Sequence, residues 1–140
     1  MEPQKQEITI KATINASIDI VWEFWTNPEH IINWCYASDD WHAPFAKNDL
    51  KEGGKFSTTM AAKDDSMSFD FIGTYTKIEE NKLLLYTLDD NRKVKVVFEG
   101  SGSETHVIQT FEPENENTGE LQRNGWQAIL NNFKRYVESN

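Results

Sequence analysis

The sequence is poor in cysteine, basic residues and long apolar runs, and each shortage excludes some classes of function. Cys35 is the one cysteine among 140 residues, which excludes an internal disulfide and fits a reducing cytosol. Lys and Arg number 14 against 23 Asp and Glu, which gives a formal net charge of -9 at pH 7. Such a charge repels a phosphate backbone and an anionic surface, so we expect neither nucleic acid nor a membrane as a partner.

No segment of the chain approaches the apolar run of about 18 residues that a membrane span needs. The first residues, Met1 to Ile8, include Glu2, Lys5 and Glu7 and cannot form a secretory signal, so we expect a cytoplasmic protein. Aromatic residues are abundant instead, with five Trp, eight Phe and four Tyr to bury in a core. The length is that of one domain, and we expect a single domain over residues 1–140.

The first part of the chain predicts a strand and two short helices. Apolar and polar residues alternate over Glu7–Ile14, the period of a half-buried strand. Ser17 stands at an N-cap position before apolar residues at helical spacing over Ile18–Thr26. Because the residue before a proline avoids the helical conformation, Asn27-Pro28 predicts a break and then a second helix over Pro28–Trp34, with Ile31, Ile32 and Trp34 turned inward.

Six further strands are expected between clusters of turn residues. Their ranges are Trp41–Phe45, Lys55–Ala62, Ser68–Ile78, Leu83–Leu88, Lys93–Glu99 and Thr105–Glu112. After a polar loop over Pro113–Gly119, an apolar stripe predicts a long helix over Glu120–Ser139. Short connections favour antiparallel neighbours. The predicted fold is therefore α+β, a curved antiparallel sheet of about seven strands wrapped around the C-terminal helix, with two short helices between strands one and two.

The sequence predicts a particular conformation or packing role for four glycines. Gly53-Gly54 forms a turn in which a positive φ is expected. Gly73, inside a strand, lets the strand bend or lets the long helix approach. Gly125 lies inside the long helix, where glycine costs about 1 kcal/mol relative to alanine. We expect Gly125 to allow close packing of the helix against the sheet.

This order of elements, together with particular residues, resembles the START-like (SRPBCC, helix-grip) superfamily, and within it the family of homologues of the heat-shock protein 90 ATPase activator. The resemblance covers nearly the whole chain. Its matching pieces are Val21 to Glu29 with Trp34, Glu52 to Phe56, Gly73 to Ile78, Lys82-Leu83, Tyr86-Thr87, Val94 to Phe98, Thr105 with Val107, and Gly125-Trp126 with Leu130. Family members often carry an arginine near the first glycine turn, where this chain has Lys51 as the nearest cation.

No residue pattern indicates catalysis, a metal or a cofactor. His30, His42 and His106 lie far apart, without the spacing of metal ligands. We expect His30 to face solvent, His106 to point away from the face of Val107, and His42 to lie near the mouth of the fold. Cys35 has no basic neighbour to lower its pKa and reads as a structural, partly buried thiol.

The acidic pairs fall in or beside predicted turns, where solvated charges are normal. Asp70 lies between Phe69 and Phe71 in a strand, so alternation sends it to the outer face if the two aromatic residues point inward. We therefore assign no catalytic residue.

The superfamily's fold encloses a cavity between the sheet and the long helix, and aromatic and apolar side chains are available to line it. Tyr75, Tyr86 and Gln109 would supply its polar tips. The predicted ligand-binding residues are Trp41, Phe45, Phe56, Thr58, Met60, Phe69, Phe71, Tyr75, Tyr86, Phe98, Gln109, Trp126, Ile129, Leu130 and Phe133.

Three functional hypotheses follow. The first is the binding of a small apolar, lipid-like molecule without chemistry. The second, which the resemblance implies, is a protein-interaction module of co-chaperone type, with a chaperone or another protein as partner. The third is a cavity enzyme of cyclase or hydrolase type, with Tyr75, Tyr86 or His42 as proton carrier. The chain could be a monomer, or a homodimer formed through exposed aromatic residues at the two short helices.

Overall fold

The computed structural model describes residues 7–114 and 117–140. Seven strands and three helices follow one another along these residues. In chain order they are β1 (Ile8–Ile14), α1 (Ile18–Thr26), α2 (Pro28–Ile31), β2 (Trp41–Asn48), β3 (Lys55–Ala62), β4 (Ser68–Glu79), β5 (Leu83–Leu88), β6 (Lys93–Ser101), β7 (Glu104–Phe111) and α3 (Gly119–Glu138). The predicted order of strand, two helices, six strands and helix is confirmed.

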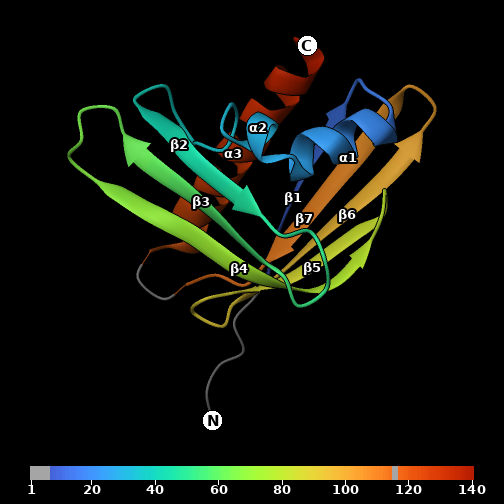
Figure 1. The fold of residues 1–140 in the computed structure, drawn as a ribbon. Coiled ribbons are helices and arrows are strands. Elements are labelled where there is room, and N and C mark those ends of the chain that lie inside the picture. The colour runs from blue at the N-terminus through green and yellow to red at the C-terminus, as the bar shows by residue number, and fades with distance from the viewer. Residues whose placement is uncertain (1–6, 115–116) are drawn as a thin grey trace.

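The strands form one antiparallel sheet in the order β1-β7-β6-β5-β4-β3-β2. β2 to β7 pair with their neighbours in sequence, while β1 pairs with the last strand, from Ile8 opposite Phe111 to Ile14 opposite Thr105. The connection through α1 and α2 therefore crosses from one edge of the sheet to the other. Figure 1 shows the sheet curved like a trough, with α3 along its hollow side and α1 and α2 over one end. This confirms the predicted α+β fold.

The break between α1 and α2 is confirmed, but α2 is shorter than predicted. The side chain of Asn27 caps α2 by accepting a hydrogen bond from the Glu29 N–H at 3.0 Å. The helix ends at Ile31, and the chain continues in turns to a buried Trp34, whose indole N–H donates to the Phe24 carbonyl at 3.0 Å. Ile32 was expected inside and is exposed, because the turn that buries Ile31 and Trp34 points Ile32 outward.

The long helix α3 lies against β1 and the hollow of the sheet. Thr118 caps its first turn by accepting a hydrogen bond from the Leu121 N–H at 3.1 Å. Leu130, Phe133 and Val137 form its buried face. On the side next to β1, the Lys134 ammonium donates to the Thr13 carbonyl at 2.6 Å. None of the described helices has the length and apolar character needed to cross a membrane.

Gly53 has a φ of +84°, as predicted for the turn. The close approach of the long helix expected at Gly73 and the close packing expected at Gly125 are wrong. A Cβ at Gly73 would lie 2.6 Å from the ring of Phe56, so this glycine makes room for an aromatic ring on the neighbouring strand and not for the helix. A Cβ at Gly125 would have no atom within 4 Å, so this glycine faces open space instead of packing closely.

One end of the hollow is filled by an aromatic cluster, which we call the packed end. It contains Trp22, Trp25, Trp34, Phe98 and Phe133, contributed by α1, the turns after α2, β6 and α3. Edge-to-face pairs join the cluster, with ring centroids of Trp25 and Phe133 4.9 Å apart and those of Trp34 and Phe133 4.8 Å apart. Such pairs favour a dense core over a void.

Candidate functional site

Beyond the packed end, a cavity of about 340 Å³ lies between α3 and the strands of the hollow. Its walls are mostly aromatic and apolar. Trp25, Trp34 and Cys35 close its inner end, while Phe69 and Leu121 line it on the side where side chains are exposed, Leu121 by 58%. A cavity of this size, apolar and with a few polar groups, has the properties of a small-molecule site.

Most of the residues predicted to bind a ligand line this cavity. They come from β3, β4, β5, β7 and α3, because alternate strand residues and one helix face point into the hollow. The residues brought together are Phe56, Thr58, Met60, Phe69, Phe71, Tyr75, Tyr86, Gln109, Trp126, Ile129 and Leu130. Whether they bind a ligand remains a prediction.

Four residues of the predicted set do not line the cavity. Phe45 is 53% exposed, because a shift of register against β3 between His42 and Phe45 reverses the alternation of β2. Trp41 precedes this irregularity and packs beside Phe69, with ring centroids 5.9 Å apart. Phe98 and Phe133 belong to the packed end, where each ring forms an edge-to-face pair with Trp25.

Several lining residues were missed by the sequence reasoning. Trp25, Ile31 and Trp34 were expected to be interior residues of the short helices, but nothing indicated that those helices close the cavity. Asn48 lies beyond the predicted strand Trp41–Phe45, and in the structure it ends β2 and lines the cavity. Gly125 also lines the cavity, consistent with the open space above it.

The polar groups of the inner cavity remain uncharged at neutral pH. The Tyr75 hydroxyl donates to Asn48 Oδ1 at 2.8 Å, and burial raises the pKa of Tyr75 more than this hydrogen bond lowers it. Burial also raises the pKa of Tyr86, which is partly offset by the neighbouring amide of Gln109. Burial raises the pKa of the Cys35 thiol to about 12. These groups can donate hydrogen bonds, but none is poised as a base or a thiolate nucleophile.

The histidines are separate in space as well as in sequence. His106 is exposed beside Thr13, as predicted, with Nδ1 3.0 Å from the threonine hydroxyl. His30 was expected in solvent but stacks on Phe24 and contacts the Tyr136 hydroxyl through Nδ1 at 2.7 Å. His42 is absent from the cavity wall. Among the described residues, no group of three His, Cys, Asp or Glu side chains could hold a metal ion.

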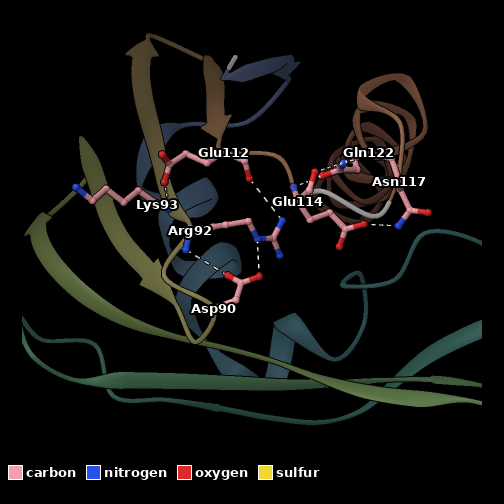
Figure 2. Close-up of polar contacts among 7 residues, drawn as sticks. All are labelled: Asp90, Arg92, Lys93, Glu112, Glu114, Asn117 and Gln122. Carbon is pink, nitrogen blue, oxygen red and sulfur yellow. Dashed lines mark hydrogen bonds and ion pairs between the residues drawn. The ribbon is translucent and has the colours of Figure 1, made fainter. Parts of the chain in front are cut away.

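The rim of the cavity is polar, and its groups bind one another. Figure 2 shows the guanidinium of Arg92, whose Nε donates to Asp90 Oδ2 at 2.7 Å and whose Nη1 reaches the Glu112 carbonyl at 3.5 Å. The Glu112 carboxylate accepts from the Lys93 backbone N–H at 2.6 Å. The charge of Arg92 is therefore paired with Asp90, in the turn between β5 and β6.

The start of α3 completes the rim. Gln122 is buried, and its Nε2 donates to the Asn117 carbonyl at 2.9 Å and to the Glu114 carbonyl at 3.2 Å (Figure 2). Its Oε1 accepts from the Glu114 N–H at 2.8 Å. One glutamine thus ties the chain that precedes α3 to the first turn of the helix, and fixes this side of the opening.

A curved antiparallel sheet around a C-terminal helix, with a cavity between them, defines a helix-grip protein of the START-like (SRPBCC) superfamily. A sequence model described as "Activator of Hsp90 ATPase homolog 1-like protein" matches residues 15–138. The chain belongs to this AHSA1-like family, as its sequence pieces indicated. A search of the curated proteins gives no match.

Solved structures agree with this assignment. The chain is 45% identical to an AHSA1-like protein from Aeromonas hydrophila, covering 96% of this chain and 93% of that one, with a TM-score of 0.90. It is 54% identical to Chr148 from Cytophaga hutchinsonii over the same shares, with a TM-score of 0.82. A protein from Chromobacterium violaceum shares the fold at 17% identity, with a TM-score of 0.84, covering 96% of this chain and 99% of that one.

Proposed function

We propose that this protein binds a small hydrophobic molecule in the cavity between α3 and the sheet. The observation that carries the proposal is the cavity of about 340 Å³ itself, which lies beside a densely packed aromatic core. Interiors of proteins are close-packed, so a void of this size among large side chains needs an occupant or a reason. A bound apolar molecule would fill the void and would explain why the protein keeps it.

Gly125 supports the proposal independently. It faces open space on the cavity wall, although alanine would stabilise the helix by about 1 kcal/mol and would meet no atom within 4 Å. A side chain at this position would occupy the cavity. The glycine is therefore explained by the volume that it leaves free.

A fluorescent apolar probe tests the proposal. We expect N-phenyl-1-naphthylamine to gain fluorescence on binding, and to raise the melting temperature, since a ligand at about 100 times its Kd adds roughly 2.7 kcal/mol to the stability of the folded state. Gly125→Leu should fill the cavity and lower the affinity for the probe by about tenfold or more. The protein should stay folded, because the added side chain enters free space.

Asn124→Leu is the matched control, because it adds the same side chain to the neighbouring, exposed position of α3. Its probe affinity should equal that of the original protein. Equal affinity of the Gly125→Leu variant would show that the probe binds elsewhere, and absence of probe binding to the original protein would remove the proposal.

Co-chaperone activity is the second candidate, and the description of the matching family favours it. The outer face of β2 presents Phe45 to solvent, which could contact a partner protein. The test adds this protein to a heat-shock protein 90 ATPase and measures the rate of hydrolysis. A faster rate that Phe45→Ser abolishes would support this function, and an unchanged rate would remove it.

A further inference from the structure

Five polar side chains are buried among the described residues, and they divide into two groups. Thr26 and Thr105 each donate a hydrogen bond of 2.8 Å to a backbone carbonyl, of Trp22 and Ala16 respectively. Gln122 makes the three backbone hydrogen bonds of the rim. Each of these side chains therefore has a structural partner that accounts for its burial.

The other two, Thr58 and Gln109, differ in that neither side chain binds a backbone group of a described residue. Thr58 is 4% exposed and Gln109 is 7% exposed. Their side-chain polar atoms are either paired or open to free space, because no fully buried side-chain N or O atom of the described residues lacks a hydrogen-bond partner. Both line the cavity. The one polar side-chain contact of Gln109 among the described residues is with the hydroxyl of Tyr86, which is also buried and also lines the cavity.

Polar side chains that line an apolar cavity restrict its ligand, because a ligand that covers them without binding them leaves their hydrogen bonds unmade. A buried donor or acceptor without a partner costs roughly 1–3 kcal/mol, and a side-chain amide offers two N–H donors and a carbonyl acceptor. Thr58, Tyr86 and Gln109 have this hydrogen-bonding capacity in the cavity wall, where a ligand can reach it. A ligand with a polar group placed there would make the hydrogen bonds that a wholly apolar ligand would leave unmade.

The surroundings restrict the chemistry of that ligand. Arg92 and Glu114 are the charged residues of the described cavity wall, and both belong to the rim, where Arg92 is held by Asp90 and Glu114 by Asn117. An ionised group placed deep in the cavity would lose its hydration without gaining a counter-ion. An uncharged oxygen would keep its hydrogen bonds.

We propose that Gln109 and Tyr86, with Thr58, form an internal polar subsite for an uncharged hydroxyl or carbonyl group of a flat aromatic or polycyclic ligand. The aromatic rings that surround these residues favour a flat molecule, because they pack against ring faces and edges. This inference rests on the proposed function, since it assigns a ligand class to the same cavity.

Three probes of nearly equal shape test the subsite: naphthalene, 2-naphthol and 2-naphthoate. Each displaces N-phenyl-1-naphthylamine at pH 7, and the ratio of their dissociation constants is the readout. We expect 2-naphthol to bind about tenfold more tightly than naphthalene, because its hydroxyl finds partners in the wall. We expect 2-naphthoate to bind at least about tenfold more weakly than 2-naphthol, because no interior cation receives its carboxylate.

Substitutions then locate the preference. Tyr86→Phe, Gln109→Leu and Thr58→Val remove hydrogen-bonding groups while keeping similar volume, so each should lower the preference for 2-naphthol, and the variant with all three changes should lose it. Thr59→Val and Gln127→Leu are the controls, because their side chains bind Asp70 and Lys11 outside the cavity, at 2.7 Å and 3.2 Å. Both controls should keep the tenfold preference, since they leave the cavity wall intact.

The outcomes separate the two proposals. If naphthalene binds and 2-naphthol binds no better, the subsite is wrong and the proposed function stands. If 2-naphthoate binds best and Arg92→Gln removes its advantage, the rim and not the interior recognises polar groups, and the subsite is wrong. If none of the probes displaces the dye, or the dye does not bind, the proposed function falls and the subsite with it.

Discussion

The two ends of the hollow between α3 and the sheet are built from the same kinds of residue and yet differ in what they enclose. At the packed end, Trp25, Trp34 and Phe133 meet at centroid distances of 4.8–5.0 Å and leave a solid core. At the other end, which we call the cavity end, rings also pair, Phe56 with Tyr86 at 4.9 Å and Phe71 with Trp126 at 5.8 Å, but these side chains line a void. The difference lies in the cover, because α1 and α2 lie over the packed end and reach the cavity only at its inner end, through Trp25 and Ile31.

This comparison explains how one small domain can be both stable and hollow. The stability resides in side chains that are enclosed on all sides by α1, α3 and the sheet. The cavity end can then carry features that a solid core does not tolerate, namely a helical glycine above open space and polar side chains that face a void. If the comparison is right, substitutions at the two ends will differ in size and in sign.

The largest effect is expected at the packed end. Phe133→Ala should lower the free energy of unfolding by about 3–5 kcal/mol, because it removes a fully buried ring and leaves a new void. Phe71→Ala, on the half-buried cavity wall, should cost about half as much, since part of its surface is already free of contacts. Urea unfolding followed by circular dichroism measures both. Equal losses would mean that the two ends are equally well packed.

The second effect concerns the contact of Phe56 with Gly73. Gly73→Ala should destabilise the protein by about 1–3 kcal/mol, because a Cβ would overlap the Phe56 ring and overpack the wall of the cavity end. The distance of 2.6 Å leaves no room for it without a shift of the ring. Combining Gly73→Ala with Phe56→Leu should restore part of the loss. A lack of any recovery would show that the strain lies in the backbone and not in this contact.

Gly125→Ala should have the opposite sign. It is expected to stabilise the unliganded protein by about 1 kcal/mol, because alanine favours the helix and its methyl group enters open space. The same chemical change at Gly73 and Gly125 thus reports on contact and void respectively. Thermal unfolding of the two single variants measures the contrast, and a destabilised Gly125→Ala protein would mean that α3 packs more closely than the structure shows.

Sequence patterns predicted the fold well, because strand alternation, helix caps and turn residues are local signals. They placed Phe56, Thr58 and Gln109 on the inner face correctly, since those strands keep an uninterrupted period of two. They misplaced Phe45, where the register shift in β2 reverses the alternation. Pro44 lies within this irregularity and is the signal that could have revealed it, because proline inside a strand marks an edge or a bulge.

The extent of the cavity could not be predicted in the same way. Phe133 and Leu130 lie on the same stripe of α3, and only the position of α1 and α2 decides which of them enters a core and which lines a void. The openness above Gly125 likewise depends on the curvature of the whole sheet. These are properties of tertiary structure, for which a helical period carries no information.

The smallest effect tests how the packed end holds the end of α3. The Glu138 carboxylate accepts hydrogen bonds from the Lys134 ammonium at 2.7 Å and from the Asn15 N–H at 2.8 Å, and these lower its pKa. A carboxyl whose pKa is lowered by folding adds stability above its ordinary pKa of about 4.5, and this stability is lost as the pH falls through the folded-state value.

Glu138→Gln should therefore destabilise the protein by about 0.3–0.5 kcal/mol at pH 7, the magnitude of an exposed helical ion pair. The difference should shrink as the pH is lowered from 7 to about 3, because the carboxyl of the original protein loses its charge as the pH falls through its lowered folded-state pKa. Urea midpoints at both pH values measure it, with Glu80→Gln as a control that removes the same charge from a turn. If the Glu80 and Glu138 variants behave alike, net charge and not the tie to Asn15 causes the effect, and the end of α3 is held by its buried face alone.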